Sequence, residues 1–264
     1  MKYGFIGCGN MGGVLARCAA KAVDPGEIAL CSASGETALR LAGELGASGA
    51  AAEEIASGCA FIVLGVKPGT VPKVLEQISP VLAKRGGGFT IVSMAAGVSI
   101  RGIKDAAGDW PVIRMMPNTP SGVGEGIIAY SVSPEVDKET EEEFLRVFSG
   151  AGVLDRVDEG LMDAVSAISG CAPAFVYMFI EALADGAVEC GMPRAKALMY
   201  AGQTVLGSAA MALRSGRHPE ALKDEVCSPG GATIAGVHAL EEAGFRGASM
   251  EAVCAAFRRV RQLG

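Results

Sequence analysis

The sequence predicts two domains, an α/β domain with a mainly parallel sheet followed by an all-helical domain. Short apolar strands alternate with helical segments through the first half, which is typical of a doubly wound sheet. After about Asp158 the strand signals stop and only helical patterns follow. The 264 residues suffice for two ordinary domains. We therefore predict a first domain over residues 1–157 and a second over residues 158–264.

The elements of the first domain follow from apolar runs separated by turn residues. We expect strands at residues 2–6, 27–31, 60–64, 89–93, 112–114 and 127–130. We expect helices at residues 10–22, 34–45, 71–82 and 134–148. The run at 60–64 is apolar throughout, as in a parallel strand that helices cover on both faces.

The second domain is predicted to hold helices at residues 172–189, 194–213, 219–226 and 247–261. The long helices are apolar nearly all round and rich in alanine and glycine. Such helices must be buried on most sides, which one small domain cannot achieve alone. We therefore predict an intertwined homodimer, with a single compact helical domain as the alternative.

A dinucleotide fingerprint opens the chain. Gly7-Cys8-Gly9-Asn10-Met11-Gly12 matches G-x-G-x-x-G and lies between the first expected strand and helix, so the first domain is predicted to be of the Rossmann type. NAD-binding versions usually carry an acid about 20 residues further on. This chain has Ser32-Ala33-Ser34 there, and hydroxyls with helix N–H groups can hold a 2′-phosphate. Arg40 lies further along the helix. NADP(H) is favoured, with NAD(H) as the alternative.

Two further loops follow expected strands at their carboxyl ends, where open α/β sheets bind ligands. In Gly65-Val66-Lys67-Pro68, the lysine either reaches the cofactor or substrate or is a solvated loop residue. The small residues of Ser93-Met94-Ala95-Ala96-Gly97 either admit a nicotinamide ring or serve tight packing.

The most informative segment is Ser228-Pro229-Gly230-Gly231-Ala232-Thr233. A tight turn brings two hydroxyls to the predicted start of a helix. Unpaired N–H groups and the helix dipole there form a site for a small anion such as a carboxylate. A cofactor site and a carboxylate site in one chain indicate a redox enzyme that acts on a small acid.

Composition excludes several other classes. The net charge is −6 without a basic cluster, so nucleic acid is not an expected partner. Eight cysteines show no C-x-x-C pair or metal-ligand spacing, which predicts reduced, structural thiols and no metal. The apolar run at 163–181 is too short for a span, and Gly170 and Pro173 interrupt it, so no membrane is expected. The N-terminal apolar run is too short for a signal peptide, which predicts a cytoplasmic protein.

The ordered set of motifs resembles the pyrroline-5-carboxylate reductase family along essentially the whole chain. It comprises the fingerprint, Val66-Lys67-Pro68, the segments at 93–97 and 114–120, Ala172-Pro173-Ala174-Phe175, Gly191-Met192-Pro193-Arg194, His218-Pro219 and 222–233. The resemblance implies NAD(P)H-dependent reduction of the imine of 1-pyrroline-5-carboxylate to L-proline. It also implies a domain-swapped dimer, often assembled into a decamer of five dimers. The chain departs from the family at Cys171 and Ala52, where serine and asparagine are common.

The resemblance, together with the motifs, also assigns the sites. The expected cofactor residues are Ile6, Gly7, Gly9, Asn10, Met11, Gly12, Ser32, Ser34, Val66, Lys67, Pro68, Ala95 and Ala96. The expected substrate residues are Ser228, Gly230, Gly231, Ala232 and Thr233, which bind a cyclic imino acid. Thr233 is the expected catalytic residue, because its hydroxyl can hydrogen-bond the ring nitrogen and relay a proton from water.

Two alternatives remain beside the interpretation as a pyrroline-5-carboxylate reductase. A 3-hydroxyacid dehydrogenase, or another imine oxidoreductase, would share the two-domain plan. The hydroxyacid enzymes use a lysine on the first long interdomain helix, and this chain has no lysine between Lys138 and Lys196. A non-catalytic NADP-binding regulator is the other alternative, since fold does not fix function. The retained segment at 228–233 favours turnover.

Overall fold

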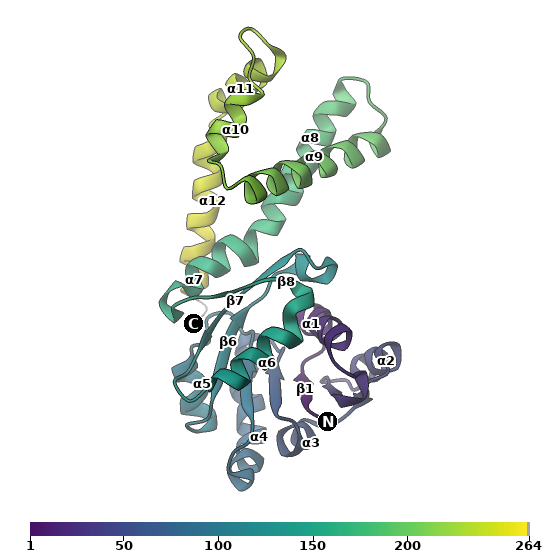
Figure 1. The fold of residues 1–264 in the computed structure, drawn as a ribbon, viewed down its shortest axis with the longest axis vertical. Coiled ribbons are helices and arrows are strands. Elements are labelled where there is room, and N and C mark those ends of the chain that lie inside the picture. The colour runs from purple at the N-terminus through teal and green to yellow at the C-terminus, as the bar shows by residue number, and fades with distance from the viewer. Residues whose placement is uncertain (263–264) are drawn as a thin grey trace. The chain divides into compact units, whose positions relative to one another are not determined.

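The computed structural model describes residues 1–262 and separates into two compact units (Figure 1). Among the described residues, unit 1 comprises Met1–Gly170 and residues 256–262, and unit 2 comprises Cys171–Ala255. The compact units divide later than residue 158 because Met162 is buried against Met116 and Ala129. The boundary of the two functional domains at 157/158 stays a prediction.

Unit 1 contains an eight-stranded sheet with the order β3-β2-β1-β4-β5-β6-β7-β8. The strands are β1 Tyr3–Ile6, β2 Ile28–Cys31, β3 Ser48–Gly49, β4 Phe61–Leu64, β5 Thr90–Ser93, β6 Val112–Met116, β7 Gly126–Val132 and β8 Gly152–Arg156. Neighbours are parallel except β6 and β7. The strand order reverses beside β1 and β4, which places a ligand crevice at their carboxyl ends.

Helices cover both faces of this sheet, as the doubly wound prediction requires. They are α1 Asn10–Ala22, α2 Glu36–Leu45, α3 Ala52–Gly58, α4 Val71–Arg85, α5 Ile100–Ala107 and α6 Lys138–Phe148. One buried cluster joins the sheet to α1, α2 and α6 through Leu15, Leu41 and Phe144. A second cluster joins it to α3, α4 and α5, for example through Ile55 and Ile78. The Rossmann-type fold class is confirmed.

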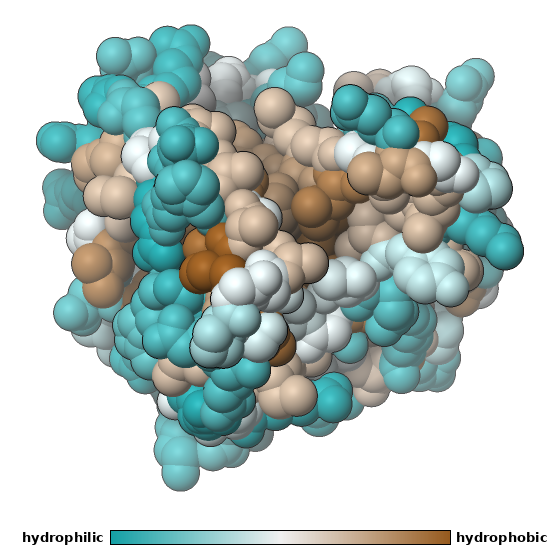
Figure 2. Space-filling view, turned by 90° about the horizontal axis from the view of Figure 1, so that it is seen from above, coloured by the Kyte–Doolittle hydropathy of each residue, from teal (hydrophilic) through white to brown (hydrophobic). Residues whose placement is uncertain are grey.

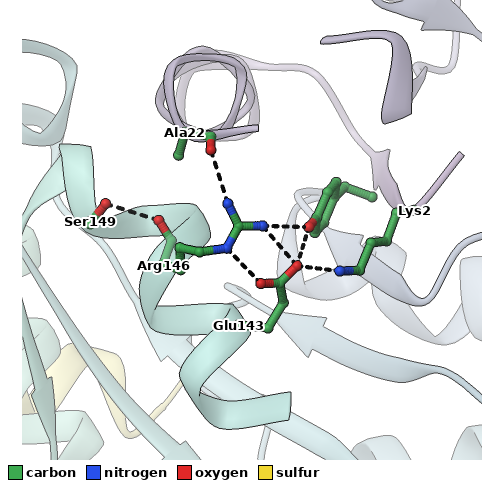
Figure 3. A network of polar contacts seen from close by, with 6 residues as sticks. Lys2, Ala22, Glu143, Arg146 and Ser149 are labelled. Atoms are coloured by element: carbon green, nitrogen blue, oxygen red, sulfur yellow. Dashed lines mark hydrogen bonds and ion pairs between the residues drawn. The ribbon is translucent and has the colours of Figure 1, made fainter. Parts of the chain in front are cut away.

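A polar network fixes α6 against the amino end of β1 (Figure 3). The Glu143 carboxylate accepts hydrogen bonds from Lys2 and Tyr3 and, at 2.7 Å, from Arg146 Nε. Arg146 Nη1 also donates to the carbonyl oxygen of Ala22 at 3.0 Å, which ties in the end of α1. Arg146 above all, with Lys2 and Tyr3, lowers the pKa of Glu143 to about 2. The network therefore joins segments from both ends of unit 1's sequence.

A long helix begins within unit 1, and it corrects one expectation. Helical structure runs without a break over Glu159–Glu189, 31 residues long. Gly170 lies in a π-helical turn at Ser166–Cys171, and Pro173 lies in the first turn of α8 Ala172–Glu189. The expectation that these two residues interrupt the apolar run is therefore wrong. By length and composition alone this helix could cross a membrane, and 11% of its most apolar window is buried. One such helix is weak support for a span, because helices of soluble proteins pass the same test.

Unit 2 is helical throughout. After α8 come α9 Arg194–Ser215, α10 Pro219–Glu225, α11 Ala232–Glu242 and α12 Phe245–Val260, of which the residues from Ala256 on belong to unit 1. Its buried apolar cluster consists only of Ala184, Ala197 and Ala201 among the described residues. Large apolar side chains of α8 and α9 stay exposed, including Met178 (70%), Met199 (61%) and Tyr200 (57%). Figure 2 shows hydrophobic residues, in brown, at the surface of the single chain. These helices need a partner to bury their apolar sides.

Candidate cofactor and substrate sites

Three glycines let the ends of β1 and β4 approach the first turn of α1. Gly7 has φ +104°, and a Cβ there would lie 2.6 Å from the Gly65 carbonyl carbon. A Cβ on Gly12 would lie 1.9 Å from the Gly7 oxygen, and one on Gly65 would lie 2.4 Å from the same atom. Backbone therefore packs directly on backbone at this crevice. The fingerprint did not reveal that Gly65 belongs to the same contact.

The amino end of α1 is open and suits an anion. Gly9 is the N-cap, and within residues 1–262 no side chain caps this helix. A Cβ on Gly9 would meet nothing within 4 Å, so space remains directly above the first turn. The N–H groups of Asn10 and Met11 and the helix dipole are then available to a pyrophosphate. Glycine packing below and open space above fit a dinucleotide.

The loop after β2 is built to present hydroxyls. Ser32 Oγ accepts a hydrogen bond from the Ala38 amide at 3.0 Å, which leaves the hydroxyl hydrogen to donate to a ligand. Ser34 is exposed, and Gly35 turns the chain into α2 with φ +73°. Among the described residues, no side chain caps α2 either. These groups suit an oxyanion such as a 2′-phosphate.

A cavity of about 390 Å³ lies beside the glycine loop. Its wall includes Gly9, Asn10, Thr37 and two arginines, Arg17 and Arg40. Both guanidinium groups pair with the single carboxylate of Glu44, at 2.5 and 3.0 Å. The cavity therefore has an excess of positive charge although the chain is acidic. Arg40, which lies further along the helix than Ser32 and Ser34, lines this cavity.

The loops after β4 and β5 reach the same edge of the sheet, because both strands are parallel neighbours. Lys67 is exposed between Val66 and the turn Pro68–Thr70. Ala95 is buried and Ala96 half-buried, so only small side chains cover the backbone there. Ile6 is buried at the end of β1. The structure thus brings all the expected cofactor segments to one edge.

Arg114 illustrates a residue that serves structure. It lies on β6 with 5% of its side chain exposed. Nη1 lies 3.1 Å from Glu159 Oε1, and Nη2 lies 3.7 Å from Asp163 Oδ1. Two carboxylates thus neutralise this cation. These contacts give Arg114 the role of a structural salt bridge.

In unit 2 the segment at 228–231 forms a turn that leads into α11. The Gly231 amide donates to the Ser228 carbonyl oxygen at 3.0 Å, and Gly230 has φ +68°. A Cβ on Gly231 would lie 2.3 Å from Ser228 Oγ. Gly230 is therefore favoured for its left-handed backbone, and Gly231 leaves room for the Ser228 hydroxyl in its present position.

The start of α11 offers donors to a carboxylate. Gly231 is its N-cap, and no side chain of the described chain caps it. Ala232 and Thr233 form the first turn, and the side chains of Ser228 and Thr233 are exposed. Beside the turn lies an open cavity of about 590 Å³ lined by Gly230, Gly231, Lys223 and His238, among others. The uncapped first-turn amides of α11 and the two exposed hydroxyls suit a small acid, whereas Lys223 in the cavity wall is already paired with Glu220 and Asp224.

The two histidines have other contacts. His218 Nδ1 accepts a hydrogen bond from the Glu220 amide at 3.2 Å and so caps α10. His238 is 72% exposed and lies 3.4 Å from Glu242, one helical turn away. His218 thus serves as a helix cap, and Thr233 remains the candidate within the turn itself.

Comparisons with known proteins place the chain in a family. A family model described as pyrroline-5-carboxylate reductase dimerisation matches residues 159–263, and one described as NADP oxidoreductase coenzyme F420-dependent matches residues 2–97. Pyrroline-5-carboxylate reductase of Escherichia coli K12 is 42% identical over 99% of this chain and 98% of its own length. This chain belongs to the pyrroline-5-carboxylate reductase family. The resemblance drawn from the ordered motifs is confirmed.

Solved reductase structures share the whole fold. A Plasmodium falciparum pyrroline carboxylate reductase with NADP bound has a TM-score of 0.88 at 33% identity, covering 100% of this chain and 98% of its own. A pyrroline-5-carboxylate reductase from Coxiella burnetii has a TM-score of 0.90 at 29% identity, covering 100% and 98%. Because the dimerisation model spans the helices with uncovered apolar sides, this reductase-family chain forms homo-oligomers.

Proposed function

We propose that this protein reduces the imine of 1-pyrroline-5-carboxylate to L-proline, the last step of proline biosynthesis, with NADPH as the favoured reductant and NADH as the alternative. The observation that carries the proposal is the uncapped amino end of α11 behind a Ser-Pro-Gly-Gly turn, in a chain of this family that also keeps an open glycine loop. The substrate is a small cyclic imino acid, and the enzyme acts on a C=N bond.

The cofactor residues divide by the part of the dinucleotide they suit. The amides of the first turn of α1, with Gly7, Gly9 and Gly12, would hold the pyrophosphate. Ser32 and Ser34 would hold the 2′-phosphate, and Val66-Lys67-Pro68 with Ala95 and Ala96 would line the nicotinamide end. Bound NADPH supplies the hydride, and these residues supply its position.

The substrate residues perform the remaining steps. The carboxylate accepts hydrogen bonds from the first-turn amides of α11 and from the Ser228 hydroxyl. The Thr233 hydroxyl lies in the same turn and donates a hydrogen bond to the imine nitrogen of the substrate ring. A threonine is too weak an acid to protonate the imine unaided, so Thr233 orients the ring and relays a proton from water. The carbon gains the hydride and the nitrogen keeps the proton, which yields the secondary amine.

We propose an intertwined homodimer, five of which assemble into a decamer, in the cytoplasm. The dimerisation model and the exposed apolar side chains of α8 and α9 support the dimer. Hydride transfer requires the imine carbon to come within about 3–3.5 Å of the nicotinamide, whichever chains supply the two sites. Light scattering at micromolar concentration measures the mass, and a monomer would contradict this assembly.

The function is tested by following NADPH absorbance after adding racemic pyrroline-5-carboxylate and by quantifying proline. We expect turnover with one proline formed per NADPH consumed. A Thr233→Ala variant should lower kcat/KM by roughly 10- to 1000-fold, the range of general acid–base groups, and Thr233→Ser should restore most of it. Tight NADPH binding without turnover would instead favour a non-catalytic regulator.

A further inference from the structure

The helices on either side of the substrate turn gain little from burial in their own chain. Neither α10 nor α11 contains a buried residue within residues 1–262. The apolar side chains of α11 are also open, with Ile234 41% and Leu240 43% exposed. Segments with few buried contacts open easily, so other contacts must set the angle between these two helices in this chain.

A chain of ion pairs provides such contacts. Glu220 of α10 accepts from Lys223 Nζ at 2.7 Å and from Arg246 Nη2 at 2.8 Å. Arg246 Nε in turn donates to Glu241 of α11 at 2.6 Å. We call Lys223, Glu220, Arg246 and Glu241 the Arg246 clip. A planar guanidinium with donors in a fixed fork holds two acceptors at a defined angle.

The clip is anchored at one end and lies beside the turn at the other. Phe245, the neighbour of Arg246, packs on Phe179 of α8 with ring centroids 5.6 Å apart. Lys223 and Glu241 line the same open cavity as Gly230 and Gly231. Lys223 and Arg246 lower the pKa of Glu220 to about 2, so this carboxylate stays charged at neutral pH. The clip thus connects α8, α10 and α11 around the turn.

We propose that Arg246 is a positioning residue for the substrate turn, an inference that rests on the proposed function. By holding Glu220 and Glu241, it fixes the two helices that flank Ser228–Gly231 and thereby the direction of the α11 amides and of Thr233. Exposed ion pairs contribute little to the free energy of unfolding. A misplacement of about 1 Å, however, can cost about 100-fold in rate. Arg246 therefore matters for catalysis far more than for stability.

The test compares Arg246→Ala with Arg246→Lys and with a matched control, Arg194→Ala. Arg194 is equally exposed and pairs with Asp185, but it joins the start of α9 to α8. We expect Arg246→Ala to lower kcat/KM for pyrroline-5-carboxylate by about 10- to 100-fold, mainly through kcat, and to leave the NADPH Kd unchanged. Arg246→Lys should recover part of the loss because an ammonium can still pair with one carboxylate. The control should behave as wild type.

Amide deuterium exchange over residues 226–234 gives a readout that does not depend on turnover. Arg246→Ala should speed exchange in this segment, and Arg194→Ala should not. If Arg246→Ala folds poorly, Glu241→Ala serves instead, because it removes only the contact between Arg246 and α11. We expect the same loss of kcat/KM and the same faster exchange in that variant. Wild-type kinetics and exchange in Arg246→Ala would overturn the inference. If the wild-type protein itself lacked turnover, the proposed function would fail, and the exchange data would still decide whether the clip orders the turn.

Discussion

Replacing Gly12 by alanine should damage the cofactor site in a way that the backbone geometry quantifies. The new Cβ would lie 1.9 Å from the Gly7 carbonyl oxygen, which is a backbone atom and cannot rotate away. Ordinary contact needs at least 3.4 Å, so α1 and the glycine loop must separate by about 1.5 Å. Overpacking of this kind costs about 1–3 kcal/mol of stability. A chain of this size then loses roughly 2–12 °C in Tm.

Two other glycines give matched comparisons. The methyl group added in Gly9→Ala would have no atom within 4 Å, so this variant should keep the Tm of the wild type. The same methyl group would occupy space above the α1 amides, so it should weaken NADPH binding. Gly43→Ala, within α2 and equally free of neighbours, should keep NADPH binding and slightly raise Tm. Gly12→Ala should lower Tm and also raise the NADPH Kd by about 10- to 100-fold, because the displaced α1 amides lose a hydrogen bond to the charged pyrophosphate that contributes about 1.5–3 kcal/mol.

Differential scanning calorimetry and NADPH fluorescence titration measure these effects. A Gly12→Ala variant with the Tm and the NADPH Kd of the wild type would contradict this prediction. A loss of thermal stability in Gly9→Ala as large as that in Gly12→Ala would also contradict it, because the two positions would then not differ in packing.

Three further predictions concern the remaining sites. Arg40→Ala should raise the Kd for NADPH and for 2′,5′-ADP about tenfold and leave the Kd for NADH unchanged, since a hydrogen bond to a charged group such as a 2′-phosphate contributes about 1.5–3 kcal/mol. The control is Arg101→Ala, which removes another exposed i,i+4 ion pair, and equal losses of NADPH affinity in the two variants would refute the prediction. Because the pKa of Glu143 falls from 4.5 to about 2 on folding, the stabilisation of the fold by its carboxylate is complete above pH 4.5 and is lost as the pH falls toward 2. Glu143→Gln should therefore flatten the acid limb of a Tm-against-pH curve, and an unchanged limb would show that Glu143 does not cause the loss of stability in acid. Met199→Glu, at a position 61% exposed in the single chain, should reduce the mass in light scattering if α9 lies in the oligomer interface, whereas an unchanged mass would place the interface elsewhere.

Local patterns predicted the strongly periodic elements well. The expected helices at 10–22 and 172–189 have the same bounds as α1 and α8. The strand β8 was missed because it is largely exposed and ends in Asp155 and Arg156, so it lacks an apolar run. The short helices α3 and α5 were also missed, although Ser99 caps α5 by accepting from the Gly102 amide at 3.0 Å, a signal the sequence did contain.

The candidate sites divide in the same way. The glycine loop and the turn at 228–231 are contiguous segments, so their chemistry could be predicted from neighbouring residues. The contact of Arg246 with Glu220 joins positions separated by 26 residues along the chain, and the place of Arg40 in its cavity depends on how α1 and α2 pack. Such arrangements leave no local signal in composition or spacing. The uninterrupted helix over Glu159–Glu189 was likewise unforeseen, because its π-helical turn accommodates residues that usually break helices.

A crystal structure of the protein with NADP and L-proline would probe the assignment of the two sites most directly. We expect proline with its carboxylate on the amides of Ala232 and Thr233, its nitrogen near the Thr233 hydroxyl, and its reduced carbon about 3–3.5 Å from the nicotinamide. Proline bound well away from the start of α11 in every subunit would contradict this expectation.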